Sequence, residues 1–148
     1  MATTNYSNLY VLNPDGRTYT VINDPNNLRN GEGVWVRALV SLPAGTVATD
    51  IALFAPVSAG VRPLYGLITA TATNGSLTGT LGYTSSVSAI ASLTTEIQSN
   101  TATLLTPAQL KAVTVLPVAG DNLILTLAGT FTNPTVIGVA IHFVNCGS

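Results

Sequence analysis

The most regular hydrophobic pattern in the sequence runs from Val34 to Phe54. Every second residue from Val34 to Leu42 is apolar, which is the period of a half-buried β-strand. Pro43 and Gly45 follow and are typical of a tight turn. A second alternating stretch then places one set of side chains on a common face: Val47, Thr49, Ile51 and Leu53. The pattern predicts a central hairpin of two strands, residues 34–42 and 47–54, with these faces buried.

Similar alternation predicts strands on both sides of this pair. Asn13-Pro-Asp-Gly16 separates two β-rich runs, residues 9–12 and 17–22, and this turn sequence favours a β-hairpin. Asn74-Gly75 predicts another hairpin, between residues 64–73 and 77–83. The remaining predicted strands are residues 111–118, 123–127 and 136–144.

Helical signals are few. Val87, Ile90, Leu93 and Ile97 have helical spacing, so residues 85–100 are interpreted as a short helix or a turn-like loop. Thr106-Pro107 can begin one more helical turn, with proline at its first position.

About eight strands with at most one short helix predict an all-β fold, an antiparallel β-sandwich of jelly-roll type. The linker of residues 23–33 is rich in turn-forming residues and nearly free of apolar ones. It divides the chain into residues 1–33, an N-terminal arm or hairpin with its linker, and residues 34–148, the sandwich core. The hairpin has two possible placements: extended toward a neighbouring protein, or folded back on the edge of its own sheet.

Charge is unusually sparse. Charged residues make up 7% of the 148 residues, against about 25% in ordinary soluble domains. A surface with so little self-repulsion is poorly protected against association, which predicts a homo-oligomer or a surface covered by another protein. Five Lys and Arg with a net charge of −1 predict no binding to nucleic acid.

Targeting and membrane signals are also missing from the pattern. The longest apolar run, residues 136–144, is shorter than the ~20 residues of a membrane-spanning helix. Residues 1–7 contain no basic region followed by an apolar core, as a secretory signal would. We therefore expect neither insertion in a membrane nor export.

No group of residues predicts catalysis. His142 and Cys146 are the single histidine and cysteine, and four residues of extended chain hold them too far apart to form a nucleophile–base pair. The acidic residues occur singly, without the clusters that acid–base catalysis or a metal ion requires. We expect no enzyme, no cofactor, no metal and no small-molecule substrate.

The aromatic residues are the better candidates for binding. Trp35, Tyr65 and Tyr83 could form a sugar-stacking platform, or fill the core or a subunit contact. In the hairpin, Tyr10 and Tyr19 could supply contact area on either side of the turn that begins at Asn13. The candidate partner-binding residues are Tyr10, Asn13, Tyr19 and Trp35.

Several of these patterns together resemble a known class of proteins. They are Leu42-Pro-Ala-Gly-Thr46, Asp50-Ile-Ala-Leu53, Gly82-Tyr83 with the Ser-, Ala- and Thr-rich stretch after it, and the closing strand Gly138-Val-Ala-Ile-His-Phe143. Over residues 34–144 the chain resembles the small β-sandwich structural proteins of tailed bacteriophages, most closely the head decoration or cement proteins.

The resemblance implies a trimer on the capsid exterior, made in the host cytoplasm, which joins neighbouring capsomers of the major capsid protein. It implies no catalytic residues, because the class has none. The alternative is a receptor- or carbohydrate-binding β-sandwich at the head of a phage fibre or tail, in which the aromatic residues would form the binding platform.

Overall fold

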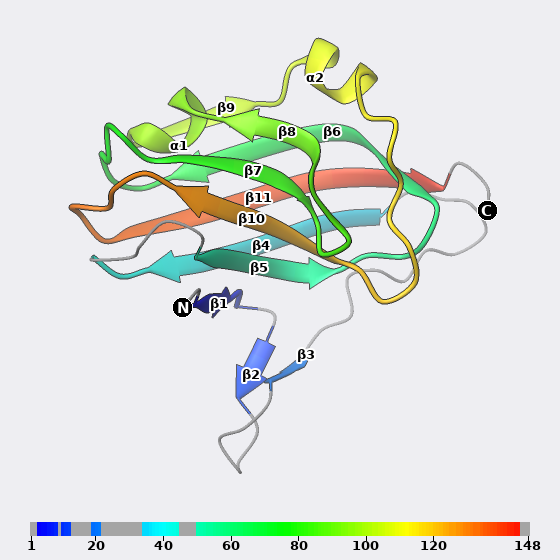
Figure 1. Ribbon diagram of the computed structural model, residues 1–148, viewed down its shortest axis with the longest axis horizontal. Coiled ribbons are helices and arrows are strands. Elements are labelled where there is room, and N and C mark those ends of the chain that lie inside the picture. The colour runs from blue at the N-terminus through cyan, green and yellow to red at the C-terminus, as the bar shows by residue number, and fades with distance from the viewer. Residues whose placement is uncertain (1–2, 9, 13–18, 22–33, 45–49, 146–148) are drawn as a thin grey trace.

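The computed structural model describes residues 3–8, 10–12, 19–21, 34–44 and 50–145, and they form eleven strands and two short helices (Figure 1). The first strands are β1 (Thr4–Tyr6), β2 (Tyr10–Leu12), β3 (Tyr19–Val21), β4 (Val34–Leu42), β5 (Ile51–Pro56) and β6 (Val61–Ala70). The later elements are β7 (Thr78–Tyr83), β8 (Ser86–Leu93), α1 (Thr95–Gln98), β9 (Thr101–Leu104), α2 (Pro107–Lys111), β10 (Asn122–Ala128) and β11 (Thr135–Asn145).

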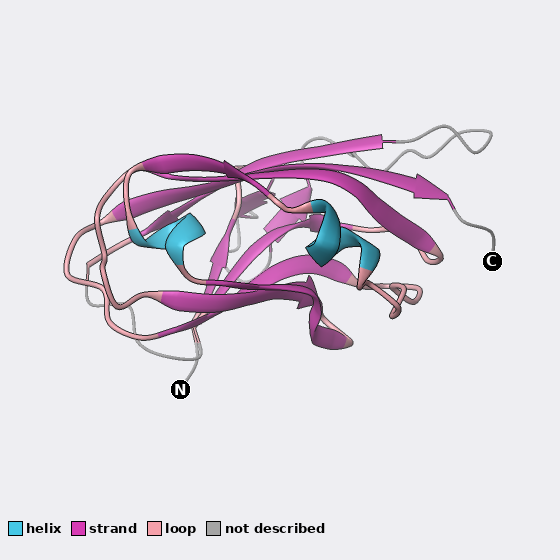
Figure 2. Ribbon diagram, turned by 90° about the horizontal axis from the view of Figure 1, so that it is seen from above, coloured by secondary structure: helices cyan, strands magenta, loops and turns pink. Residues whose placement is uncertain are grey.

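Two sheets pack face to face, which confirms the predicted all-β sandwich (Figure 2). One sheet has the order β1-β5-β10-β7-β8, and the other has the order β4-β11-β6-β9. All pairings in them are antiparallel except that of β1 with β5. Of the connections from β4 to β11, only β7–β8 stays within one sheet, so the chain passes repeatedly from one layer to the other.

The predicted central hairpin is wrong, because β4 and β5 belong to opposite sheets. The predicted face of β4 is correct, with Val36 and Val40 fully buried. In β5 the predicted face is the wrong one: Ala52 and Phe54 are buried, whereas Ile51 and Leu53 are only partly buried. Val47 and Thr49, which the prediction also placed on that face, lie outside the described residues. Both alternating sets in this strand are apolar, so alternation alone could not identify the buried face.

The second predicted hairpin is also a crossover, since β6 and β7 lie in different sheets. Asn74 is buried here and joins three segments at one end of the sandwich. Its Oδ1 accepts hydrogen bonds from the backbone N–H groups of Thr132 (3.0 Å) and Asn133 (2.9 Å), and its own N–H donates to the Gln98 carbonyl (2.7 Å). Turn-forming residues at this position therefore support a change of sheet and not a hairpin.

Two further assignments differ from the prediction. Of the residues with helical spacing in residues 85–100, Val87, Ile90 and Leu93 lie in strand β8. The helix is confined to Thr95–Gln98. β8 pairs along β7, and this ladder outweighs a weak local preference. Residues 112–118 form no strand, whereas the predicted helical start at Thr106 is confirmed by α2.

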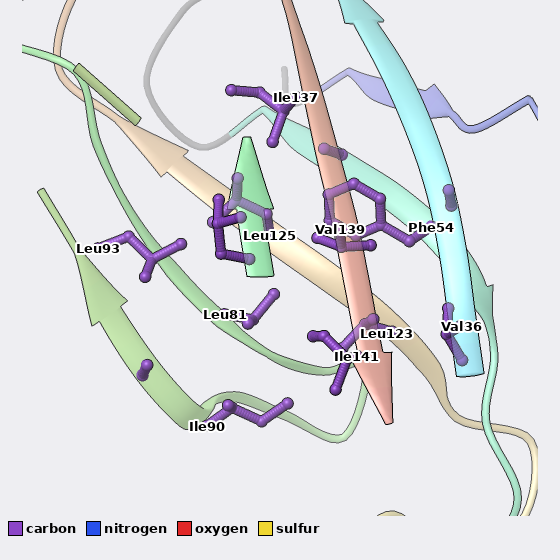
Figure 3. Close-up of a cluster of buried hydrophobic side chains, with 14 of the residues drawn as sticks. Val36, Phe54, Leu81, Ile90, Leu93, Leu123, Leu125, Ile137, Val139 and Ile141 are labelled. Carbon is purple, nitrogen blue, oxygen red and sulfur yellow. The ribbon is translucent and has the colours of Figure 1, made fainter. Parts of the chain in front are cut away.

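The hydrophobic core lies between the two sheets and contains side chains from both (Figure 3). Phe54, Leu81, Leu123 and Leu125 come from the five-stranded sheet, facing Val36, Val139 and Ile141 of the four-stranded one. All of them are nearly or completely inaccessible to solvent. Their burial is the main favourable contribution to folding.

Both open sides of the sandwich are covered. The helices α1 and α2 contact strands of both sheets (Figure 2). Their side chains Ile97 and Leu110 are buried. On the opposite side, the Ser7 N–H donates to the Leu53 carbonyl of β5 (2.9 Å), and the Asn8 N–H donates to the Leu39 carbonyl of β4 (2.9 Å). Residues 3–8 therefore connect the two sheets, although the sequence placed them in the arm.

The rest of the described arm forms a separate two-stranded sheet. The pairing of Tyr10 with Val21 and of Leu12 with Tyr19 confirms a hairpin between β2 and β3. Figure 1 shows it below β5, away from the two main sheets. The turn that begins at Asn13 lies outside the described residues.

Candidate interaction surface

The outer face of the four-stranded sheet carries large apolar side chains that are exposed to solvent. Leu39 on β4 is 49% exposed, Tyr65 on β6 is 60% exposed, and Leu104 on β9 is 71% exposed. Because neighbouring residues of a strand point to opposite faces, the burial of Val36 and Val40 directs Leu39 outward. We call this surface, formed by the outward side chains of β4, β11, β6 and β9, the apolar face.

Small residues on β11 make the centre of the apolar face low. Gly138 lies between Leu39 of β4 and Thr69 of β6 in the sheet register. A Cβ atom at this position would collide with Thr69 Oγ1 and the Leu39 side chain. A shallow depression of about 340 Å³ lies at this part of the sheet and is bordered by Leu39 and Leu67. A protrusion on a partner protein could seat here.

A β-bulge exposes additional large apolar side chains at one end of the apolar face. β6 pairs Tyr65 with His142 and Pro63 with Phe143 of β11, so Leu64 is the extra residue. Leu64 and Tyr65 are consecutive, yet both are exposed. The bulge has therefore turned two neighbouring large apolar side chains outward, which regular alternation would not permit.

Beside the bulge lies a groove of about 590 Å³, between β6 and the segment that leads from β9 into α2. Its apolar walls include Leu64, Leu104 and Leu110. Two cationic residues also line it, and Arg62 Nη2 donates a hydrogen bond to the Lys111 carbonyl oxygen (3.2 Å). The groove is thus apolar along its walls and positively charged at Arg62 and Lys111.

The candidate residues from the sequence lie at different places. Trp35 is in β4, opposite His142 of β11, and His142 is itself opposite Tyr65 of β6. The ring centroids of Tyr65 and His142 are 6.3 Å apart. Tyr10 and Tyr19 belong to the separate β2–β3 sheet. The structure therefore brings together the strand positions of Trp35, His142 and Tyr65, and does not place the hairpin residues in that sheet.

Tyr83 cannot belong to an aromatic platform, because it is completely buried. Its hydroxyl group has no hydrogen-bond partner among the described residues. Burial in the core, together with the negative charge of Asp121, raises the pKa of the Tyr83 hydroxyl. Tyr83 is a core residue.

Sequence reasoning missed Leu39, Leu64 and Leu104. Leu39 was detectable as an apolar residue on the polar side of the alternation in residues 34–42. Leu64 is exposed because of a bulge, and Leu104 because β9 is an edge strand, and neither has a local sequence signal.

Other kinds of site are not found in the described part of the chain. No group of three or more His, Cys, Asp or Glu residues there could hold a metal ion. No helix among the described residues is long and apolar enough to cross a membrane. Cys146 lies outside them.

No protein-family model matches the sequence, and no curated protein matches it. Among solved structures, a chain of the cyanophage Pam1 capsid asymmetric unit has a similar fold, with a TM-score of 0.62 and 14% sequence identity. The likeness covers 85% of this chain and 94% of that chain. At this identity the likeness is one of fold. The two chains are of similar length, and the shared fold spans most of both.

Proposed function

We propose that this chain is a virion structural protein of a tailed phage, which decorates the outside of the capsid and stabilises contacts between capsomers of the major capsid protein. The observation that carries the proposal is the apolar face, which exposes Leu39, Tyr65 and Leu104 on a chain with only 7% charged residues. Exposed apolar patches of this kind mark sites of protein association.

The likeness in fold supports this proposal. Nearly the whole of a similarly sized chain from a phage capsid asymmetric unit aligns with this one. A β-sandwich of this size therefore occurs in a phage capsid as a separate chain. We also infer a jelly roll, because β4 to β11 alternate between sheets of order β4-β11-β6-β9 and β5-β10-β7-β8, as in two interlocked Greek keys.

The proposed mechanism is burial of surface without chemistry. A stable protein interface buries roughly 800 Å² on each partner, and apolar area contributes about 25 cal/mol per Å² before the costs of association. A decoration protein that touches several capsomers opposes their separation with each such contact. The outside of the capsid is favoured because the chain has five Lys and Arg and lacks the positive charge needed to face packaged DNA.

Purified capsids stripped of this protein provide the test. The Leu39→Glu variant should bind such capsids at least about tenfold more weakly than the wild type, because it would bury an unpaired charge. Val87→Glu is the matched control, since Val87 is similarly exposed but lies on β8 in the other sheet. Equal binding of wild type and Leu39→Glu, or no binding of the wild type, would refute the proposed use of this face.

We further propose that the chain forms a homo-oligomer, most simply a trimer, as the resemblance to decoration proteins implies. Sparse charge leaves little repulsion between copies. Analytical ultracentrifugation at micromolar concentration should show a single species of three chains. A stable monomer over this range would contradict self-association without excluding assembly on a capsid.

A second candidate function is carbohydrate or receptor binding at the head of a fibre. One observation favours it: Tyr65 is 60% exposed, with the His142 ring 6.3 Å away and Trp35 on the next strand. Exposed aromatic rings on a sheet can stack on sugars. A glycan array should then show binding that Tyr65→Ala abolishes, whereas a decoration protein should bind no glycan.

A further inference from the structure

On the side of β6 that faces away from β11, strand β9 pairs with only one half of β6. β6 runs from Val61 to Ala70, but β9 pairs only with its residues from Leu67 to Ala70. The last bond of this ladder is from the Leu105 N–H to the Gly66 carbonyl (2.8 Å). Beyond it the chain turns into α2, and the groove of about 590 Å³ opens beside the first half of β6. The groove thus lies between α2 and the half of β6 that β9 does not pair with.

The free edge of β9 adjoins the same groove. In an antiparallel ladder, residues alternate between those bonded to one neighbour and those bonded to the other side. Because Leu105 bonds to β6, the alternation directs the backbone groups of Leu104 and Ala102 away from β6, toward the open edge. Leu104 and Ala102 are both exposed. Such an edge is a template for an added strand.

The side chains in the groove define which segment would fit. Leu64, Tyr65 and Leu104 present apolar surface, and Arg62 and Lys111 supply positive charge. No described acidic residue lines the groove. An extended segment would place alternate apolar side chains against these walls, and a carboxylate on it would meet the two cations.

A second copy offers no such segment on its described surface. Asp50 and Asp121 are buried. Glu96 belongs to helix α1, where its Oε2 accepts a hydrogen bond from the Thr94 N–H (2.8 Å). Among the described residues of a second copy, no acidic side chain is therefore available to meet the two cations, whereas Asp15, Asp24 and Glu32 lie outside the described residues. We take a different protein as the source of the segment and make a second copy an outcome of the test.

We propose that an extended, mainly apolar segment of another protein adds as a strand to the free edge of β9 and continues into the groove between β6 and α2, where a carboxylate on the segment meets Arg62 and Lys111. The inference rests on the proposed capsid role only for the source of the segment, which would then be a capsid subunit. Strand addition combines backbone hydrogen bonds with side-chain pockets, so it holds a partner without an enzyme-like site.

The test uses the full chain labelled with ¹⁵N and three synthetic octapeptides with blocked ends. The first alternates valine and threonine around one central glutamate. The second has lysine in place of the glutamate, and the third is the first with alternate backbone amides methylated. The glutamate peptide should shift the amide signals of residues 62–66 and 102–111. The lysine peptide should bind about tenfold more weakly, the effect of losing one charge-assisted hydrogen bond, and the methylated peptide should bind equally weakly.

Two variants test whether Arg62 and Lys111 cause the preference for the glutamate peptide over the lysine peptide. The double substitution Arg62→Gln with Lys111→Gln should abolish the preference for glutamate over lysine. Arg37→Gln is the matched control, because Arg37 is exposed on β4 of the same sheet and does not line the groove. It should keep the preference, and the spectrum of each free variant should show an intact fold.

Several results would overturn the proposal. No binding of the glutamate peptide at millimolar concentration would do so, as would signal shifts confined to another surface. Equal binding of the methylated peptide would reveal a simple apolar pocket without strand addition. Shifts of the same signals on concentrating the protein alone would assign the groove to a second copy. No capsid enters this experiment, so its failure is distinguishable from failure of the proposed function.

Discussion

Asn8 and Leu39 are joined by two hydrogen bonds across the side of the sandwich. The Asn8 N–H donates to the Leu39 carbonyl, and Asn8 Oδ1 accepts from the Leu39 N–H, both at 2.9 Å. The preceding residue, Ser7, donates its N–H to Leu53 of the opposite sheet (2.9 Å). Two consecutive residues near the N-terminus therefore bind different sheets and hold them together.

We expect Asn8→Ala to lower the free energy of unfolding by about 0.5–1.5 kcal/mol, because the Leu39 N–H loses its partner. Urea denaturation measures the change, and Asn100→Ala, at an exposed position, should have little effect. Deleting residues 1–9 should cost more, since it also removes the pairing of β1 with β5. An unchanged midpoint for that deletion would show that residues 3–8 do not support the sandwich.

Val40 and Leu39 are neighbours in β4 with opposite environments, and they give a matched pair of substitutions. Val40 is 0% exposed and Leu39 is 49% exposed. Val40→Asp should cost about 3 kcal/mol or more, because it buries an unpaired charge, whereas Leu39→Asp should cost less than about 1 kcal/mol. Thermal melting of both variants tests this. If the Val40→Asp protein still melts cooperatively with a near-normal midpoint, Val40 does not lie in the core, and the buried face of β4 is assigned wrongly.

The sequence predicts the parts of this fold that depend on local patterns. Alternation identifies β4 and its buried face, and the turn at Asn13 predicts the β2–β3 pairing. Pro107 is the first residue of α2, as expected. Thr106 also caps this helix: its Oγ1 accepts from the Gln109 N–H (3.1 Å), and Gln109 Oε1 accepts from the Thr106 N–H (2.7 Å). These features involve residues close together in the chain.

The features that fail depend on contacts between distant residues. A turn sequence is equally compatible with a hairpin and a crossover, so nothing near Asn74 reveals that β6 and β7 separate into different sheets. The interaction surface is hidden for the same reason. Leu64 and Leu104 are exposed because β6 has a bulge against β11 and β9 has a free edge, both of which require the assembled sheet.

Tyr83→Phe should leave the free energy of unfolding unchanged or raise it slightly, by up to about 1 kcal/mol. The Tyr83 hydroxyl is buried without a hydrogen-bond partner in the described part of the chain, so removing it ends a desolvation cost and breaks no bond. Tyr83→Ala should instead cost several kcal/mol, because it leaves a large cavity. Denaturant titration of both variants measures these effects. Marked destabilisation by Tyr83→Phe would show that the hydroxyl has a partner.

Asp121 links the β7–β8 turn to the loop before β10. Its carboxylate accepts hydrogen bonds from the Ser85 N–H (3.0 Å), the Ser85 hydroxyl (2.6 Å) and the Val118 N–H (2.9 Å). Burial opposes ionisation of this group, but the hydrogen bonds from Ser85 and Val118 outweigh burial and lower the pKa of the Asp121 carboxyl below its ordinary value of 3.8. The folded protein therefore favours the ionised form.

The sign of the pH dependence follows from this direction. A carboxyl with a lower pKa in the folded state contributes its full stabilisation above the ordinary pKa and loses it as the pH falls through the folded pKa. The wild type should thus lose stability on acidification below about pH 4, in part through Asp121.

Asp121→Asn should be less stable than the wild type at pH 7, and the difference should shrink as the pH falls. In Ser85→Ala the Asp121 carboxylate loses one hydrogen-bond donor, so its pKa in the folded state should be lowered less than in the wild type. The stabilisation by Asp121 should therefore be smaller and be lost at a higher pH than in the wild type. Unfolding by urea at pH 7, 5, 4 and 3 measures all three proteins. If wild type and Asp121→Asn differ by the same free energy at pH 3 and pH 7, the hydrogen bonds to Asp121 do not depend on its charge, and the prediction is wrong.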